Sequence, residues 1–105
     1  MSSGYEGRRL RVAVVGTGMI AGVHARAARA SGAEVLGVLG RNAARSEQVA
    51  AQLDLPRGYA SLEEVIADAP DVVHICTPND QHHPQALAVI AAGINVVCEL
   101  SLIHI

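Results

Sequence analysis

Residues 10–21 read LRVAVVGTGMIA, and this stretch decides the fold. A β-branched apolar run stops at a turn with two glycines, and an alanine-rich segment with helical spacing follows it. This order is typical of a strand that enters a tight turn and then a helix. We therefore expect a strand over residues 10–15 and a helix over residues 19–30.

The turn has the spacing G-x-G-x-x-A, which suits the binding of a dinucleotide. Gly16 permits the tight bend, Gly18 carries no side chain that would block a pyrophosphate, and Ala21 lets the helix pack closely on the sheet. The helix N-terminus then offers unpaired N–H groups and a partial positive charge to the phosphates. A purely structural turn is the alternative interpretation of these glycines.

The rest of the chain repeats the alternation of strand and helix. Helices are expected to begin near Asn42 and at the capping box of Ser61 and Glu64. A further helix, with Pro84 in its first turn, is expected after a turn over residues 77–80. This order predicts the α/β class, with a doubly wound parallel sheet and helices on both of its faces. The further strands are expected at residues 34–39, 56–60, 71–76 and 95–98.

The composition fits one domain and excludes several classes of protein. A chain of 105 residues that is 50% hydrophobic and 17% charged is neither two domains nor largely disordered. A net charge of -2 provides no basic surface for nucleic acid or for an anionic membrane. No segment reaches the roughly 18 apolar residues that cross a bilayer. The tail at residues 1–9, expected to be flexible, has no apolar run typical of a secretory signal, so we expect a cytoplasmic protein.

The end of the second expected strand bears on the choice between NAD and NADP. An Asp or Glu about 20 residues beyond the turn would bind the ribose hydroxyls of NAD. This chain has Gly40 and Arg41 there, and no acid before Glu47. Arg41 could pair with a 2′-phosphate and stack on adenine, and Gly40 removes the repulsion that an acid would cause. The pattern favours NADP modestly; NAD, with Arg41 as an ordinary solvated side chain, is the alternative.

The pattern of histidines and cysteines predicts no metal site. His74 and Cys76 would face the same side of one strand, but no third and fourth ligand follow at a usable spacing, although His82 and His83 are near in sequence. No Ser or Cys is paired with a base in a recognisable elbow. We therefore assign no metal-binding and no catalytic residue.

Four longer stretches resemble the N-terminal Rossmann domain of the Gfo/Idh/MocA oxidoreductases, the family of glucose–fructose oxidoreductase and inositol 2-dehydrogenase. The likeness spans residues 10–99, and its T-P-N-x-x-H motif is more specific than the glycine turn. The four stretches are residues 14–21 followed by His24, residues 59–64, residues 71–79 followed by His82, and residues 92–99.

The resemblance implies a role for each matching residue. The turn at residues 16–20 would hold the pyrophosphate, and residues 77–79 would line the groove beside the nicotinamide. His82 would help to shape that region, and Glu99 matches the Glu of the family's Glu-Lys-Pro signature. Together with Arg41, the predicted cofactor-binding residues are Gly16, Thr17, Gly18, Met19, Ile20, Arg41, Cys76, Thr77, Pro78, Asn79, His82 and Glu99.

The chain departs from the family directly after Glu99. Leu100 and Ser101 stand where the family has Lys and Pro, and the chain contains no lysine elsewhere. The family's lysine orients the substrate and supports proton transfer, and leucine can do neither. Residues 100–105 do not resemble the family, and the C-terminal substrate domain is absent. We interpret the chain as a truncated or frame-shifted product.

The resemblance implies one function, and a second is left open beside it. The first is the NAD(P)-binding domain of an oxidoreductase that transfers hydride between the nicotinamide and a sugar, a polyol or a related carbonyl or alcohol substrate. Such a domain would be inactive alone and would meet its substrate only in a full-length form. The alternative is a non-catalytic module that binds or senses the dinucleotide. Apolar surface left by the absent domain also leaves open a homo-oligomer.

Overall fold

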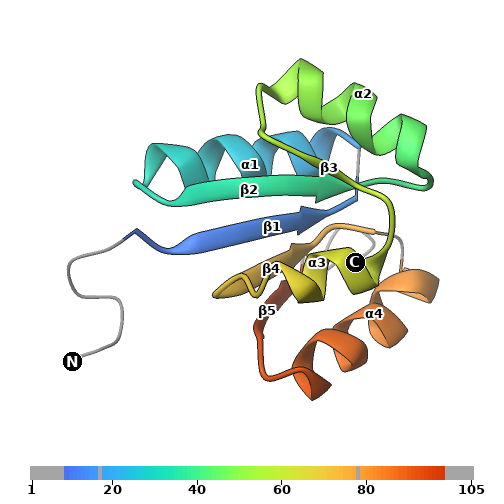
Figure 1. The fold of residues 1–105 in the computed structure, drawn as a ribbon. Coiled ribbons are helices and arrows are strands. Elements are labelled where there is room, and N and C mark those ends of the chain that lie inside the picture. The colour runs from blue at the N-terminus through green and yellow to red at the C-terminus, as the bar shows by residue number, and fades with distance from the viewer. Residues whose placement is uncertain (1–8, 17, 78, 99–105) are drawn as a thin grey trace, which may run out of the picture.

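The structure is a computed structural model that describes residues 9–16, 18–77 and 79–98, without the side chains of residues 79–83. Strands and helices alternate along this part of the chain (Figure 1). The strands are β1 (Arg11–Val15), β2 (Glu34–Leu39), β3 (Gly58–Tyr59), β4 (Val72–Ile75) and β5 (Asn95–Cys98). The helices are α1 (Met19–Ala30), α2 (Ala43–Leu53), α3 (Leu62–Ala67) and α4 (Asn79–Ala91).

The strands form one sheet in the order β3-β2-β1-β4-β5, and every neighbouring pair is parallel. The chain runs outward from β1 through β2 to β3, then returns to the other side of β1 with β4 and β5. Helices α1 and α2 cover one face of the sheet, and α3 and α4 cover the other (Figure 1). The predicted doubly wound parallel sheet is confirmed.

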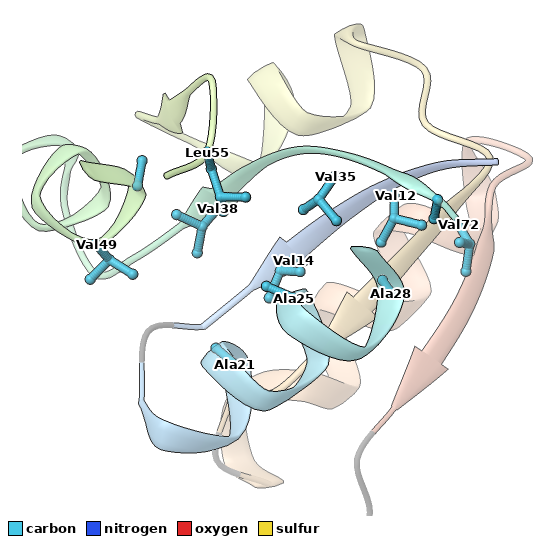
Figure 2. Packing of buried hydrophobic residues seen from close by; sticks show 12 residues of the cluster. Val12, Val14, Ala21, Ala25, Ala28, Val35, Val38, Val49, Leu55 and Val72 are labelled. Atoms are coloured by element: carbon cyan, nitrogen blue, oxygen red, sulfur yellow. The ribbon is translucent and has the colours of Figure 1, made fainter. Parts of the chain in front are cut away.

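The period-2 alternation of the strands divides the core into two layers. Val12 and Val14 of β1 belong to the cluster under α1 and α2, whereas Ala13 and Val15 belong to the cluster under α3 and α4. In the first cluster, α1 contributes the small residues Ala21, Ala25 and Ala28, as Figure 2 shows. Their short side chains let the helix lie close to β1, as the G-x-G-x-x-A spacing predicts for Ala21.

Both predicted helix caps are present. The Asn42 side chain accepts a hydrogen bond from the Arg45 backbone N–H at 2.8 Å, which starts α2. The Ser61 hydroxyl accepts one from the Glu64 N–H at 3.2 Å and starts α3. The Glu64 carboxylate reaches back to the Ala60 N–H at 2.9 Å, one residue before the cap. These contacts span three or four residues, which is why they can be predicted from sequence.

Two boundaries differ from the expectation. Helix α4 begins at Asn79, so Asn79 and Asp80 are helical rather than part of a turn, and Pro84 lies inside the helix rather than in its first turn. Proline lacks an N–H donor, so this helix forfeits one backbone hydrogen bond near its second turn. Strand β3 is only two residues long, because only Gly58 and Tyr59 pair with β2.

Large apolar side chains are exposed on α1, on α4, on the edge strand β5 and directly before β1. The most exposed of them is Met19, at 85%. Within the residues that the structure describes, no helix is long and apolar enough to cross a membrane. The exposed large apolar residues are Leu10, Met19, Ile20, Val23, Leu87, Ile90 and Val97.

Candidate dinucleotide-binding site

The glycine turn lies where the carboxyl ends of β1, β2 and β4 meet. The Gly16 N–H donates a hydrogen bond to the Leu39 carbonyl at the end of β2, at 2.7 Å. The Cys76 N–H, directly after β4, donates to the Val15 carbonyl at 2.8 Å. The turn is therefore held between the strands on either side of β1. Ligands of open α/β sheets bind at this point, where the strand order reverses.

Glycine occupies the two positions of the turn for different physical reasons. Gly16 has a φ of +123°, and a Cβ atom added to it would lie 3.0 Å from the Cys76 carbonyl oxygen. Gly18 has a φ of −79°, which any residue adopts, and a Cβ atom added there would meet nothing within 4 Å. Gly16 is thus required by the fold, whereas the open space at Gly18 is available to a ligand.

The start of α1 fits the pyrophosphate of a dinucleotide. Gly18 is its N-cap residue and has no side chain with which to occupy the first backbone N–H groups. The first turn of α1 contains no acidic residue that would repel a phosphate. Met19 and Ile20 are exposed, at 85% and 43%, so the chain does not bury this end of the helix. The residues present therefore suit an anionic ligand.

The loop between β2 and α2 carries Arg41, which is exposed. The neighbouring Gly40 N–H donates to the Ser46 hydroxyl oxygen at 2.6 Å, and that hydroxyl donates to the Asn42 carbonyl at 3.0 Å. Ser46 is completely buried. Its role is not among those predicted from the sequence, although one signal is present: Ser46 precedes Val49 and Ala50 by three and four residues, on the inward face of α2.

Cys76 and Thr77 follow β4 and are both half-buried. The Thr77 hydroxyl donates to the Gln85 side-chain oxygen at 2.6 Å, which ties the end of β4 to α4. Gln85 is a second residue that the sequence analysis missed. No local sequence pattern pairs it with Thr77, which lies eight positions earlier.

Several predicted residues lie outside the described part of the chain. These are Thr17, Pro78 and Glu99, and the side chains of Asn79 and His82. The backbones of Asn79 and His82 lie in the first turn of α4, which begins directly after the β4 loop. The roles assigned to these five residues stay predictions.

Two histidines meet on the α1 side of the sheet. The Nδ1 atom of His24 lies 2.8 Å from the Nδ1 atom of His74, and the rings are edge-to-face with centroids 5.0 Å apart. Burial lowers the pKa of His74, and the neighbouring His24 lowers it further. Among the described residues, no three His, Cys, Asp or Glu side chains gather closely enough to hold a metal ion.

Comparison with known proteins identifies the same kind of domain. Residues 10–100 match the family GFO_IDH_MocA, described as "Oxidoreductase family, NAD-binding Rossmann fold". An inositol 2-dehydrogenase from Cereibacter sphaeroides is 42% identical over 96 residues, which are 89% of this chain and 28% of the relative. The chain thus spans less than a third of the length of this relative.

Solved structures agree with the sequence match. GenD2 from gentamicin A biosynthesis, solved in complex with NAD, superposes with a TM-score of 0.77 at 37% identity and covers 90% of this chain and 27% of its own. Biliverdin reductase from Synechocystis, solved with biliverdin and NADP+, has the same TM-score at 31% identity, with coverages of 87% and 29%. Similar folds therefore occur with either dinucleotide.

Proposed function

The chain belongs to the Gfo/Idh/MocA oxidoreductase family, and we propose that it serves as the cofactor-binding part of an oxidoreductase acting on a sugar, a polyol or a related carbonyl or alcohol compound. The position of the glycine turn, between the ends of β2 and β4, carries this proposal. The substrate class is supported by the similarity to an inositol 2-dehydrogenase.

Each part of the site has its own task in binding. The Gly16–Gly18 turn and the first N–H groups of α1 receive the pyrophosphate. The β4 loop at Thr77 lines the groove on the nicotinamide side, and its bond to Gln85 fixes the direction of the loop. The bound cofactor supplies a hydride acceptor or donor at the nicotinamide ring. The protein contributes orientation, because these loops belong to strands that pack in one rigid sheet.

We further propose that NADP is preferred over NAD. Arg41 is exposed in the loop that follows β2. The last residue of β2, Leu39, accepts the hydrogen bond of the Gly16 N–H, so this loop starts beside the glycine turn. An exposed guanidinium can pair with a 2′-phosphate in two parallel hydrogen bonds. No carboxylate occurs between Gly40 and Ser46 to repel the phosphate.

The chain by itself is proposed to bind the cofactor without turnover. Leu100 stands where the family's signature has a lysine, and leucine can neither orient a substrate nor support proton transfer. A non-catalytic module that senses the dinucleotide would show the same behaviour. The two functions differ only when a substrate domain is supplied.

A thermal-shift titration of the chain with NAD, NADP and their reduced forms tests the proposal. A ligand that binds only the folded state raises its stability by about 2.7 kcal/mol at one hundred times its dissociation constant. We expect a shift with NADP or NADPH at the lowest concentration. We expect no turnover in either direction, that is, no reduction of NADP with sugars or polyols and no oxidation of NADPH with the corresponding carbonyl compounds. No shift with any of the four would refute the proposal, and turnover would refute the proposed inactivity.

A further inference from the structure

The Ser46 hydroxyl holds both sides of the loop that carries Arg41. It accepts a hydrogen bond from the Gly40 N–H at 2.6 Å and donates one to the Asn42 carbonyl at 3.0 Å. Arg41 is the single residue between these two positions. One hydroxyl therefore contacts the backbone before and after Arg41, and the Asn42 carbonyl also accepts a hydrogen bond from the Ser46 backbone N–H at 2.9 Å.

The surroundings of Ser46 make this contact rigid. Its side chain is completely buried, on the helix face that also buries Val49 and Ala50. A buried hydroxyl costs free energy unless it is hydrogen-bonded, and here its donor and an acceptor position are both used. The strand β3 packs directly against α2. A Cβ atom added to Gly58 would lie only 2.5 Å from the Ser46 carbonyl carbon. The Ser46 backbone thus has no room to shift towards β3.

The backbone at Gly40 is also connected to the glycine turn, on the side of the site proposed for the pyrophosphate. Gly40 follows Leu39, whose carbonyl accepts the hydrogen bond of the Gly16 N–H at 2.7 Å. The peptide group between Leu39 and Gly40 therefore bonds to the glycine turn through its carbonyl oxygen and to Ser46 through its N–H. A change in the position of Gly40 would move Arg41 relative to the turn.

We propose that Ser46 is a positioning residue for cofactor selection: it fixes the Gly40–Asn42 loop so that Arg41 discriminates a ribose 2′-phosphate from a 2′-hydroxyl. This inference rests on the proposed function. Ser46 is completely buried, so it acts only through the loop. Its removal leaves Arg41 in the sequence and releases the Gly40 N–H on one side, while the Asn42 carbonyl still accepts the Ser46 backbone N–H at 2.9 Å.

The test compares Ser46→Ala with Ser31→Ala in the full 105-residue chain. Ser31 lies at the far end of α1, and its hydroxyl donates to the Ala28 carbonyl at 2.8 Å. Dissociation constants for NADP and NAD are measured by isothermal titration calorimetry. We expect Ser46→Ala to bring the ratio of the two constants about three- to tenfold closer to one, the size of a lost hydrogen bond. Ser31→Ala should leave the ratio unchanged even if it lowers the melting temperature.

A double mutant separates positioning from general destabilisation. Adding Ser46→Ala to Arg41→Ala should not change the ratio further, since both substitutions remove the same discrimination. Amide hydrogen exchange gives an independent signal, because the Gly40 N–H should exchange faster in Ser46→Ala. If Ser46→Ala does not fold, Ser46→Cys, with a weak S–H donor and a somewhat larger side chain, should move the ratio in the same direction.

Different outcomes would refute the proposed function and the positioning role of Ser46. A wild-type chain that binds neither dinucleotide refutes the proposed function, and the inference with it. A wild-type chain that binds both equally, or a Ser46→Ala variant that keeps the wild-type ratio while Gly40 exchanges faster, refutes the inference alone.

Discussion

The Nδ1 atoms of His24 on α1 and His74 on β4 lie 2.8 Å apart. A hydrogen bond between two imidazole nitrogens needs one donor and one acceptor, so the bond cannot persist when both rings are protonated. The pair joins the helix that follows the glycine turn to the strand that precedes Cys76. It therefore couples protonation to the packing of α1 on the sheet.

Stability should fall as the pH decreases through the histidine range. Burial and His24 lower the pKa of His74 in the folded chain, so the unfolded chain binds more protons below the unfolded pKa of about 6.5. The free energy of unfolding then decreases with falling pH, by at most about 1.4 kcal/mol per pH unit for one proton, until the folded pKa is passed. His74→Asn keeps a hydrogen-bonding side chain without the titration. The free energy of unfolding, measured with urea between pH 5.5 and 7.5, should depend less steeply on pH in this variant than in the wild type. An equal pH dependence would contradict a lowered pKa of His74.

Gly16→Ala should destabilise the fold by about 2 kcal/mol or more, because the residue has a positive φ and the new Cβ would meet the Cys76 carbonyl at 3.0 Å. Chemical denaturation of the free chain measures this loss. Unchanged stability would show that the turn tolerates a side chain. Gly18→Ala is the matched control for the introduction of a methyl group in the same turn.

Gly18→Ala should separate binding from stability. Its φ is ordinary and the added Cβ meets nothing in the free chain, so we expect the melting temperature to stay within a few degrees of the wild type. The methyl group would occupy the space proposed for the pyrophosphate, and the dissociation constants of NAD and NADP should both rise about tenfold or more. Wild-type affinities for both cofactors would place the pyrophosphate elsewhere.

Arg41→Ala should weaken NADP binding and leave NAD binding nearly unchanged. The loss of a charge-assisted contact at an exposed site corresponds to about a five- to tenfold increase in the dissociation constant of NADP. Arg45→Ala is the control, since this arginine lies in the first turn of α2 and its guanidinium donates to the Gln48 side chain at 2.9 Å. Equal losses for both cofactors in Arg41→Ala would contradict a 2′-phosphate contact.

Tyr59→Phe should cost about 1.5–3 kcal/mol of stability, the value for a hydrogen bond to a charged group. The Tyr59 hydroxyl donates to the Asp68 carboxylate at 2.6 Å, and its ring is completely buried. Burial and the Asp68 carboxylate raise the pKa of Tyr59. Its stabilising contribution is therefore present below the unfolded tyrosine pKa of about 10 and is lost as the pH rises above that value.

Unfolding curves at pH 8 and pH 11 check both parts of this prediction. The wild type should lose more stability between these values than Tyr59→Phe does. Asp68→Asn, combined with Tyr59→Phe in a double-mutant cycle, should show non-additive losses. Additive losses would mean that the two side chains do not interact in solution.

Elements set by near neighbours in the chain were predictable. The caps at Asn42 and Ser61 follow from side chains that reach a backbone N–H three residues away. Helix α4 was less predictable, because its start at Asn79 overrides the preference of Pro84 for a first turn. The short strand β3 was placed correctly but expected to be longer, since pairing with β2 limits it to two residues.

The order of strands and helices, the glycine turn and the family resemblance can be read from the amino-acid sequence, because they depend on hydrophobic period and on contacts within a few residues. Which side chains meet around the turn becomes clear only from the three-dimensional fold. The His24–His74 pair joins residues fifty positions apart, and the bond from Thr77 to Gln85 depends on where α4 begins. Ser46 reaches Gly40 only because α2 packs back on β2 and β3. Such contacts depend on the packing of helices against the sheet, which no local pattern specifies.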